Sequence, residues 1–212
     1  LTREHVTLAW VRQRARSFAL PETLHHAEHD GRYYHFLSRV PGEMLDKLWP
    51  TADDATRNGY VDRVVGVCKE MRAVCAPAGQ APLTGVDSGF LGELYLCPRG
   101  EPLHPDALRR FAAEDLGMDC GAGNLVFYHT DLGPTNVLLD PATGTLGVID
   151  WEAAGWVPVE WMRTKFRSSS GMDLSTEPGL EYRRRVGVRL GEEGFGDMID
   201  AFGAIIDKRV AE

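Results

Sequence analysis

The chain has 212 residues, of which 43% are hydrophobic and 25% charged. This composition is typical of a soluble globular protein with one or two cores and excludes an intrinsically disordered chain. The formal net charge of −8 argues against nucleic-acid and anionic-membrane partners, because those surfaces depend on clustered Lys and Arg.

The first half of the chain predicts a helix, a strand and a second helix. Apolar residues among Arg and Gln predict an amphipathic helix over Thr2 to Arg16. The stretch from Tyr33 to Glu43 predicts an apolar strand that ends at a Pro-Gly turn. A helix is predicted from Gly59 to Ala76, with a core stripe made of Val61, Val64, Val65, Cys68, Met71 and Cys75.

Four cysteines, at positions 68, 75, 97 and 120, show no CxxC spacing and no zinc-knuckle spacing. We therefore predict a reducing, cytoplasmic compartment. The sequence has no run of about eighteen apolar residues, which a membrane span needs. Residues 77 to 101 are rich in Gly and Pro and predict a long irregular connection.

The most informative stretch runs from His129 to Asn136 and is followed by Ile149, Asp150 and Trp151. An apolar strand, Asn124 to Tyr128, leads into it. Between Asn136 and Asp150 two short apolar segments surround a Pro/Gly turn, which predicts a β-hairpin centred near residue 143. Asn136 and Asp150 should then lie almost opposite each other at its open end.

This spacing predicts a phosphoryl-transfer site. Asp131 would accept the proton of a substrate hydroxyl, and His129 would brace the loop. Asn136 and Asp150 would offer the oxygen ligands that Mg²⁺ prefers. Taken singly, Asn136 is better explained as a turn residue and Asp150 as a strand-end cap. Their combination at this spacing is what favours a kinase-type site.

The last predicted helix carries an apolar stripe made of Phe195, Met198, Ile199, Phe202, Ile205, Ile206 and Val210. Its basic neighbour, Arg183 to Arg185, is interpreted as a solvated helix face.

The motif resembles the aminoglycoside phosphotransferase and choline kinase-like family, the small-molecule branch of the protein-kinase fold. The family pattern HxDxxxxN followed by DW(E/D) appears here as His129 through Asn136 and Asp150 through Glu152. Protein kinases carry Asp-Phe-Gly instead. The stretch from Ala153 to Trp161 is especially similar to uncharacterised fungal members.

The resemblance implies an α+β, two-lobed kinase-like fold that uses ATP and Mg²⁺. Residues 1–40 would form part of the N-terminal lobe and residues 41–212 a mostly helical C-terminal lobe. Backbone groups of Ser38 and Val40 would meet the adenine edge, although a plain edge strand explains this stretch too. Glu4 would pair with the phosphate-binding Lys, or would simply be a favourable carboxylate in a first helical turn.

A complete family member would carry a nucleotide-covering Gly-rich loop and a strand with the phosphate-binding Lys before the first helix. Neither occurs in this chain, which begins at Leu1, so we expect a piece of a longer polypeptide. The resemblance places the acceptor near a set of residues, each of which has a stronger explanation in ordinary structure: Trp156, Glu160, Trp161, Arg163, Lys165 and the segment 173–181.

The favoured function is transfer of phosphate from ATP to a hydroxyl of a small molecule. An acidic surface suits a cationic acceptor, and it is also ordinary for a cytosolic protein. The alternative is a catalytically impaired or non-catalytic nucleotide-binding protein of the same fold. A metal-dependent hydrolase using Asp131, Asp140 and Asp150 is disfavoured, because Asp140 belongs to the predicted turn.

Overall fold

The structure is a computed structural model that describes residues 1–14, 16–93, 104–115, 117–175 and 181–203. Its α-helices are α1 (Glu4–Arg12), α2 (Leu45–Leu48), α3 (Asp54–Arg72), α4 (Pro105–Arg110), α5 (Val159–Ser168) and α6 (Glu181–Glu192). Its strands are β1 (Thr23–His29), β2 (Arg32–Leu37), β3 (Glu43–Met44), β4 (Leu125–Tyr128), β5 (Val137–Leu139), β6 (Leu146–Val148) and β7 (Gly155–Pro158). Single helical turns occur at Trp49–Thr51, Phe111–Asp115, Ala122–Asn124 and Ser170–Met172.

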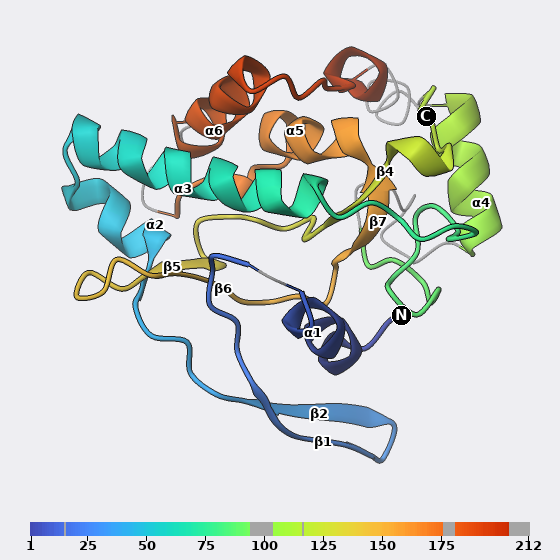
Figure 1. Cartoon of the computed structure of the whole chain (residues 1–212), viewed down its shortest axis with the longest axis horizontal. Coiled ribbons are helices and arrows are strands. Elements are labelled where there is room, and N and C mark those ends of the chain that lie inside the picture. The colour runs from blue at the N-terminus through green and yellow to red at the C-terminus, as the bar shows by residue number, and fades with distance from the viewer. Residues whose placement is uncertain (15, 94–103, 116, 176–180, 204–212) are drawn as a thin grey trace.

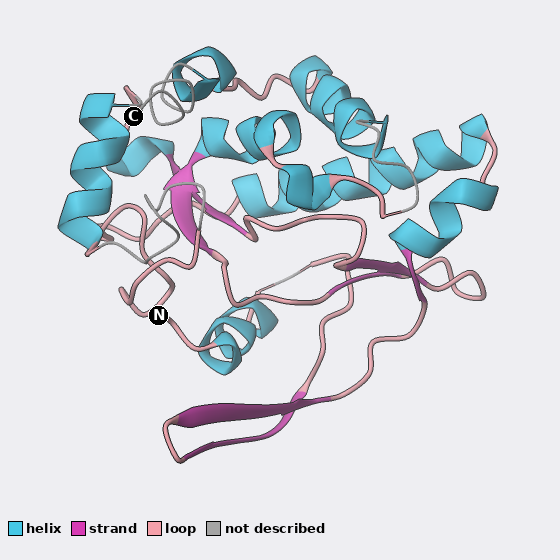
Figure 2. Cartoon of the chain, turned by 180° about the vertical axis from the view of Figure 1, so that it is seen from behind, coloured by secondary structure: helices cyan, strands magenta, loops and turns pink. Residues whose placement is uncertain are grey.

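The described strands form three small antiparallel sheets, which confirms the predicted α+β class. β1 pairs with β2, β5 pairs with both β3 and β6, and β4 pairs with β7. The β1–β2 hairpin turns at Asp30 and Gly31, both with positive φ, as a tight two-residue hairpin turn requires. This hairpin lies at the edge of the molecule beside α1, to which the Glu4–His35 contact joins it, whereas the other two sheets lie nearer to the other helices (Figures 1 and 2).

Helix α3 supplies much of the core. The predicted stripe of Val61, Val64, Val65, Cys68 and Met71 is buried. Two details of the prediction were wrong. The helix begins at Asp54 because the Asp53 side chain caps it, accepting a hydrogen bond from the Thr56 N–H at 2.8 Å. It ends at Arg72, so Cys75 lies beyond the helix and is exposed.

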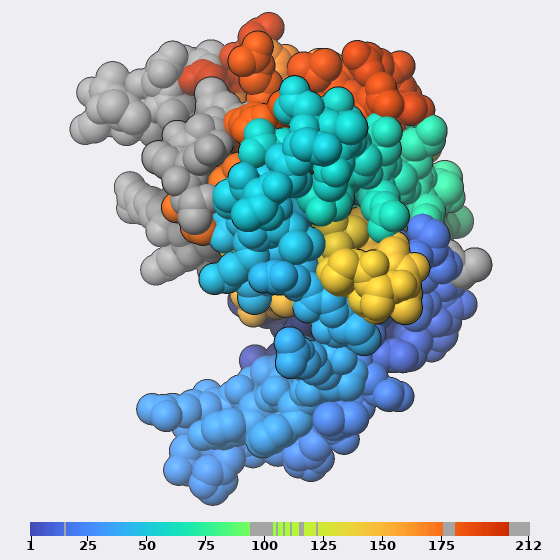
Figure 3. Space-filling model, turned by 90° about the vertical axis from the view of Figure 1, so that its left-hand side faces the viewer, coloured from blue at the N-terminus to red at the C-terminus, as the bar shows by residue number. Residues whose placement is uncertain are grey.

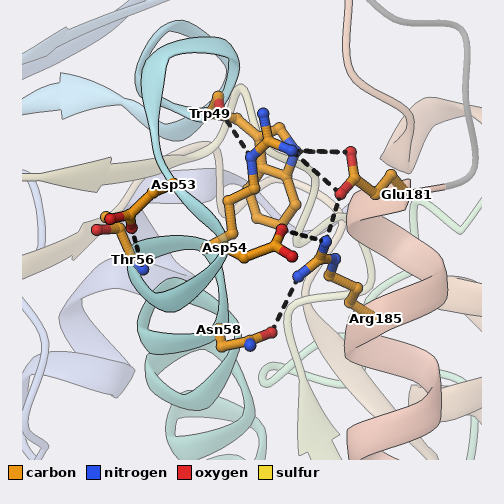
Figure 4. Close-up of polar contacts among 8 residues, drawn as sticks. Trp49, Asp53, Asp54, Thr56, Asn58, Glu181 and Arg185 are labelled. Atoms are coloured by element: carbon orange, nitrogen blue, oxygen red, sulfur yellow. Dashed lines mark hydrogen bonds and ion pairs between the residues drawn. The ribbon is translucent and has the colours of Figure 1, made fainter.

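A polar network joins the first turns of α3 to the start of α6 (Figure 4). The Glu181 carboxylate accepts hydrogen bonds from Arg57 and Arg185, at 3.3 and 2.7 Å. Arg185 also pairs with Asp54 at 2.9 Å. Behind these groups, the Trp49 ring is fully buried. The network therefore fixes α6 against α3 in addition to the apolar contacts.

Helix α1 packs on the β4–β7 sheet through an aromatic cluster. Trp10 lies with its ring centroid 4.6 Å from Phe127 and 5.4 Å from Trp156. Aromatic pairs at such distances contribute beyond the area that they bury. The helix occupies Glu4–Arg12, within the predicted range of residues 2–16.

The segment between β2 and β3 passes very close to the β5–β6 hairpin. Gly42 has a φ of 116°, and a Cβ at this position would lie 2.7 Å from the Leu139 carbonyl carbon. Across the hairpin, a Cβ on Gly147 would lie 2.3 Å from Cγ1 of Val40. Both glycines are therefore needed for the chain to pack this closely.

The remaining predictions fall partly outside the described residues. Residues 77–93 contain no helix or strand, as expected, while 94–101 lie outside the description. The last predicted helix was too long at its start, since Phe195 and Met198 precede the helical residues 199–203. Phe195 and Phe202 are buried, and Ile205, Ile206 and Val210 lie outside the description. Within the described part of the chain, no helix has the length and apolarity to cross a membrane.

We expect Gly42→Ala to lower the free energy of unfolding by about 2 kcal/mol or more, because positive-φ strain and the clash with Leu139 act together. Gly31→Ala is the matched control, since Gly31 has a φ of 69° but no atom within 4 Å of the position that a Cβ would take. Gly31→Ala should lower the free energy of unfolding by only about 1 kcal/mol. Urea unfolding measures both, and equal losses would contradict the close approach.

Candidate active site

The predicted catalytic loop, residues 129–136, connects β4 to β5, and His129 fastens it to the β5–β6 hairpin. Nε2 of His129 lies 2.9 Å from the Ile149 carbonyl oxygen, and Nδ1 lies 3.2 Å from the Asp131 backbone nitrogen. Because a backbone N–H can only donate, Nδ1 accepts and Nε2 carries the proton. His129 is thus held in its neutral form with a single tautomer.

The surroundings of His129 oppose its protonation. The side chain is fully buried, and its ring lies edge-on to Trp151 with centroids 4.6 Å apart. Burial lowers the pKa of His129 to about 4, even though the hydrogen bond to Ile149 and the charge of Asp131 act in the opposite direction. At neutral pH this residue therefore braces the loop and carries no charge.

Asp131 and Asn136 lie together, as the sequence predicted. The Asn136 side-chain nitrogen donates to the Asp131 backbone oxygen and to Asp131 Oδ2, both at 3.0 Å. Asn136 is buried, whereas Asp131 keeps partial exposure. Because the amide nitrogen is used, the amide oxygen is the atom left for a further ligand.

The register of the hairpin brings Asn136 next to Asp150. Val137 pairs with Val148, and the Ile149 N–H donates to the Asn136 carbonyl at 3.0 Å. Asn136 is therefore opposite Ile149, one residue short of the predicted partner, and Asp150 follows immediately. The register therefore agrees to within one residue with the predicted placement of Asn136 and Asp150 at the open end of the hairpin, and their role as metal ligands stays a prediction.

Asp150 lies where negative charge accumulates. It lines a cleft of about 950 Å³ together with Glu4 and Asn136. Desolvation raises the pKa of Asp150 to about 6, with further contributions from the charges of Glu152, Glu4 and Asp131. A carboxylate that is hard to ionise in this way is well suited to binding a cation, which would stabilise its charged form.

Two backbone positions beside the catalytic residues have unusual conformations. Thr130 has a φ of 64° and Asp150 a φ of 65°, values that residues other than Gly rarely adopt. The strain is offset by specific hydrogen bonds. The Thr130 hydroxyl donates to the Ala153 carbonyl at 2.8 Å, and the Trp151 N–H, next to Asp150, donates to Glu4 at 3.1 Å. Such strain often accompanies functional sites.

Glu4 reaches the cleft from α1, but its described partners differ from the predicted one. One oxygen accepts the Trp151 N–H, and the other lies 3.1 Å from Nδ1 of His35 on β2. His35 is in turn 3.0 Å from the Thr23 hydroxyl. The pairing of Glu4 with a phosphate-binding Lys stays a prediction, while its position in the cleft agrees with a role there.

The predicted adenine-binding groups line the same cleft. The Ser38 N–H is occupied by the Glu22 carbonyl at 2.8 Å. Within the described chain, no hydrogen bond involves the Ser38 carbonyl or the Val40 N–H. One acceptor and one donor two residues apart are therefore available to a planar base. The apolar walls of this part of the cleft are formed by Pro21, Leu37, Val40, Met44, Leu138 and Ile149.

Several residues assigned to the acceptor side are structural instead. Trp156 and Trp161 are fully buried. Lys165 is also buried and pairs with Glu93 at 3.0 Å, while Arg163 pairs with Asp197 at 2.9 Å. Packing and internal ion pairs therefore account for these side chains.

The sequence did not identify residues 169–171, a segment that lies beside Asp131. A Cβ on Gly171 would be 3.9 Å from Oδ1 of Asp131, and the Gly171 carbonyl approaches Gly133. The small residues 169–171 carried no sequence signal, because they follow Asp131 by about forty residues and have no distinctive chemistry. Gly171 has no side chain to fill the position next to the predicted base.

The donors fit a Mg²⁺ ion shared with phosphate groups better than a protein-only metal site. Within the described ranges, no group of three or more His, Cys, Asp or Glu side chains could hold a metal. Asp140 is used by the hairpin turn, where it accepts hydrogen bonds from Ala142 and Thr143 at 2.9 and 2.8 Å. One carboxylate and one amide oxygen remain, and Mg²⁺ commonly takes its other ligands from substrate phosphates and water.

The low pKa of His129 predicts how stability depends on pH. The unfolded chain takes up this proton near pH 6.5, the folded chain only near pH 4. The contribution to stability is complete above pH 6.5 and is lost as the pH falls toward 4. Between pH 7 and 4.5, the free energy of unfolding should fall more for the native chain than for His129→Gln, by on the order of 2–3 kcal/mol. Urea titrations across this range measure the difference; parallel curves would contradict it.

Comparisons with known proteins agree with this geometry. A family model described as the phosphotransferase enzyme family matches residues 1–161. No curated protein matches the sequence. Among solved structures, a thermostable mutant of aminoglycoside phosphotransferase APH(4)-Ia, in a ternary complex with AMP-PNP and hygromycin B, has a TM-score of 0.61 and 19% identity. The match covers 94% of this chain and 71% of that one.

Two further structures are similar. Aminoglycoside-3'-phosphotransferase of type VIII has a TM-score of 0.53 and 16% identity, covering 94% of this chain and 78% of that one. ADP-bound aminoglycoside phosphotransferase APH(2'')-Ib has a TM-score of 0.51 and 14% identity, covering 86% and 64%. At these identities the likeness establishes the kinase-like fold, and the family model, which covers well over half of the residues, establishes the family. The chain belongs to the phosphotransferase enzyme family.

Proposed function

We propose that this phosphotransferase transfers the γ-phosphate of ATP to a hydroxyl of a small molecule, with Mg²⁺ as cofactor. The observation that carries the proposal is the hairpin register. It brings Asn136 and Asp150 together at the end of a cleft, with Asp131 hydrogen-bonded to Asn136 at 3.0 Å. Phosphoryl transfer needs this kind of positioning more than covalent help from the protein.

In the proposed reaction, Asp131 accepts the proton of the acceptor hydroxyl. The hydroxyl oxygen forms a bond to the γ-phosphorus while the bond to the bridging oxygen of ADP breaks. Asn136 orients the Asp131 carboxylate through its side-chain N–H. His129 keeps the loop in place and, being neutral, does not compete with Asp131 for the proton.

Asp150 and the amide oxygen of Asn136 would hold the metal. When bound, Mg²⁺ supplies charge neutralisation for the phosphates and helps to align them. The raised pKa of Asp150 supports this assignment, because the surrounding carboxylates leave a demand for positive charge.

The nucleotide base would lie between the apolar walls of the cleft, with its edge against the Ser38 carbonyl and the Val40 N–H. We propose that the chain divides into a partial N-terminal lobe of residues 1–40 and a C-terminal lobe of residues 41–212. The site is proposed to lie between them. Glu4, which belongs to the N-terminal lobe, would lie near the phosphates of the nucleotide.

The acceptor is proposed to be a hydroxyl-bearing small molecule, with cationic compounds favoured. The net charge of −8 and the carboxylates around Asp150 attract positive charge. The APH(4)-Ia structure contains hygromycin B, so aminoglycosides are reasonable first compounds to test. Gly171 lies beside Asp131, so such an acceptor would approach Asp131 along this segment.

We expect Asp131→Asn to lower turnover by about 10²–10⁴-fold, because the proposed general base is lost. ADP affinity should change less than about twofold, since the carboxylate acts on the acceptor. ADP formation with hygromycin B and other hydroxyl-bearing amines, together with calorimetry, measures both quantities. Asp140→Asn makes the same charge change in the hairpin turn and should keep near-native activity. Full activity of Asp131→Asn would refute the assignment.

We expect Asp150→Ala to weaken ATP binding by about tenfold or more when Mg²⁺ is present, and hardly at all when it is chelated. The reason is that Asp150 would act on the nucleotide through the metal. Calorimetric titration with ATP, with and without Mg²⁺, makes the comparison. Glu152→Ala, which removes the neighbouring exposed carboxylate, should keep the effect of Mg²⁺ on affinity. Equal losses under both conditions would argue against a metal ligand at position 150.

A further inference from the structure

The cleft contains two cationic side chains, Arg39 and Lys47, to which the mechanism above gives no role. Both line the same cavity as Asn136 and Asp150. Neither forms a hydrogen bond or ion pair with another residue that the structure describes. By contrast, Lys69 pairs with Glu193 at 2.6 Å and Lys165 with Glu93 at 3.0 Å. The positive charge of Lys47 is therefore not used within the described fold.

Lys47 stands on a short helix that is tied to the catalytic loop. Its neighbour Asp46 donates its backbone N–H to the Pro134 carbonyl at 3.0 Å. The buried Asp46 carboxylate also accepts the Ser175 N–H at 2.7 Å and the Ser175 hydroxyl. Leu45 and Trp49, on either side, are fully buried. The backbone under Lys47 is thus fixed beside residues 134–136, while its side chain is exposed.

The two cations lie at different places relative to the proposed nucleotide. Arg39 is between Ser38 and Val40, the positions proposed to meet the base. Lys47 is fixed beside the catalytic loop, whose Asn136 is proposed to hold the metal and hence the phosphates. Figure 3 shows the side of the molecule on which the β1–β2 hairpin stands away from the segment containing α2.

Charge balance favours a phosphate contact. Three carboxylates, Glu4, Glu43 and Asp150, line the cleft and repel a polyanion. Even with one Mg²⁺ bound, ATP keeps negative charge that these groups disfavour. A lysine ammonium is a compact point charge with three donors and suits phosphate oxygens.

We propose that Lys47 is a nucleotide-binding residue that contacts the phosphates of ATP from the catalytic-loop side of the cleft. The inference rests on the proposed function. It predicts that Lys47 discriminates ATP from adenosine, because adenosine shares the base and the ribose but has no phosphate. Salt should reduce that discrimination, since the contact is partly exposed and therefore screened.

The experiment compares ATP–Mg²⁺ and adenosine binding by calorimetry for the native chain, Lys47→Gln, Lys47→Arg and Lys69→Gln. We expect Lys47→Gln to raise the Kd for ATP about three- to tenfold and to leave the Kd for adenosine unchanged. Lys47→Arg should restore most of the ATP affinity. Lys69→Gln makes the same change of charge outside the cleft and should bind both ligands like the native chain. Because Lys47 is exposed, the melting temperatures should be similar.

The possible outcomes separate the two proposals. If the native chain binds both ligands and Lys47→Gln binds them with the same Kd values, the assignment of Lys47 is overturned. The proposed function would still stand. An equal loss of ATP and adenosine would also overturn it, since the contact would then be with the base or the ribose. If the native chain bound neither ligand, the proposed function would fail, and the role of Lys47 with it.

Discussion

The site depends on the peptide groups of one residue, Ile149. Its N–H donates to the Asn136 carbonyl, which sets the end of the hairpin register. Its carbonyl accepts the hydrogen bond from His129, which fixes the catalytic loop to the same point. Because the His129 side chain is fully buried, water competes poorly for its bond to Ile149. The relative positions of Asp131, Asn136 and Asp150 follow from these two bonds and from the Asn136–Asp131 contact.

This arrangement carries a conformational cost that distant parts of the chain offset. Thr130 and Asp150 both have positive φ, a conformation that costs on the order of 1–3 kcal/mol for residues other than Gly. The hydrogen bond from Trp151 to Glu4 ties the second of them to α1, which is itself packed on the β4–β7 sheet by Trp10. Helix α1 therefore stabilises the end of the hairpin at which Asp150 lies.

Electrostatics determine what the cleft can accept. Three carboxylates line it, and desolvation and the charges of neighbouring carboxylates raise the pKa of Asp150 to about 6. Such a site binds a polyanion only if positive charge is added. Mg²⁺ would supply part of that charge, and the side chain of Lys47, held beside the catalytic loop by Asp46, is proposed to supply more. The same excess of negative charge favours a cationic acceptor.

The sequence by itself determined the local features of this protein. The hairpin from Asn136 to Asp150, the strand before it and the buried stripe of α3 were all predicted, because alternation, turn residues and helical periodicity act over a few neighbouring residues. The order of motif residues also indicated the family. Where a local signal was misjudged, as at the Asp53 cap, the predicted start of the helix was wrong by five residues.

Only the tertiary structure decided which distant groups meet. The bonds from Glu4 to His35 and Trp151, the burial of Lys165 against Glu93 and the position of Lys47 join segments up to 147 residues apart. No local pattern encodes these contacts, since they depend on how the helices and sheets pack.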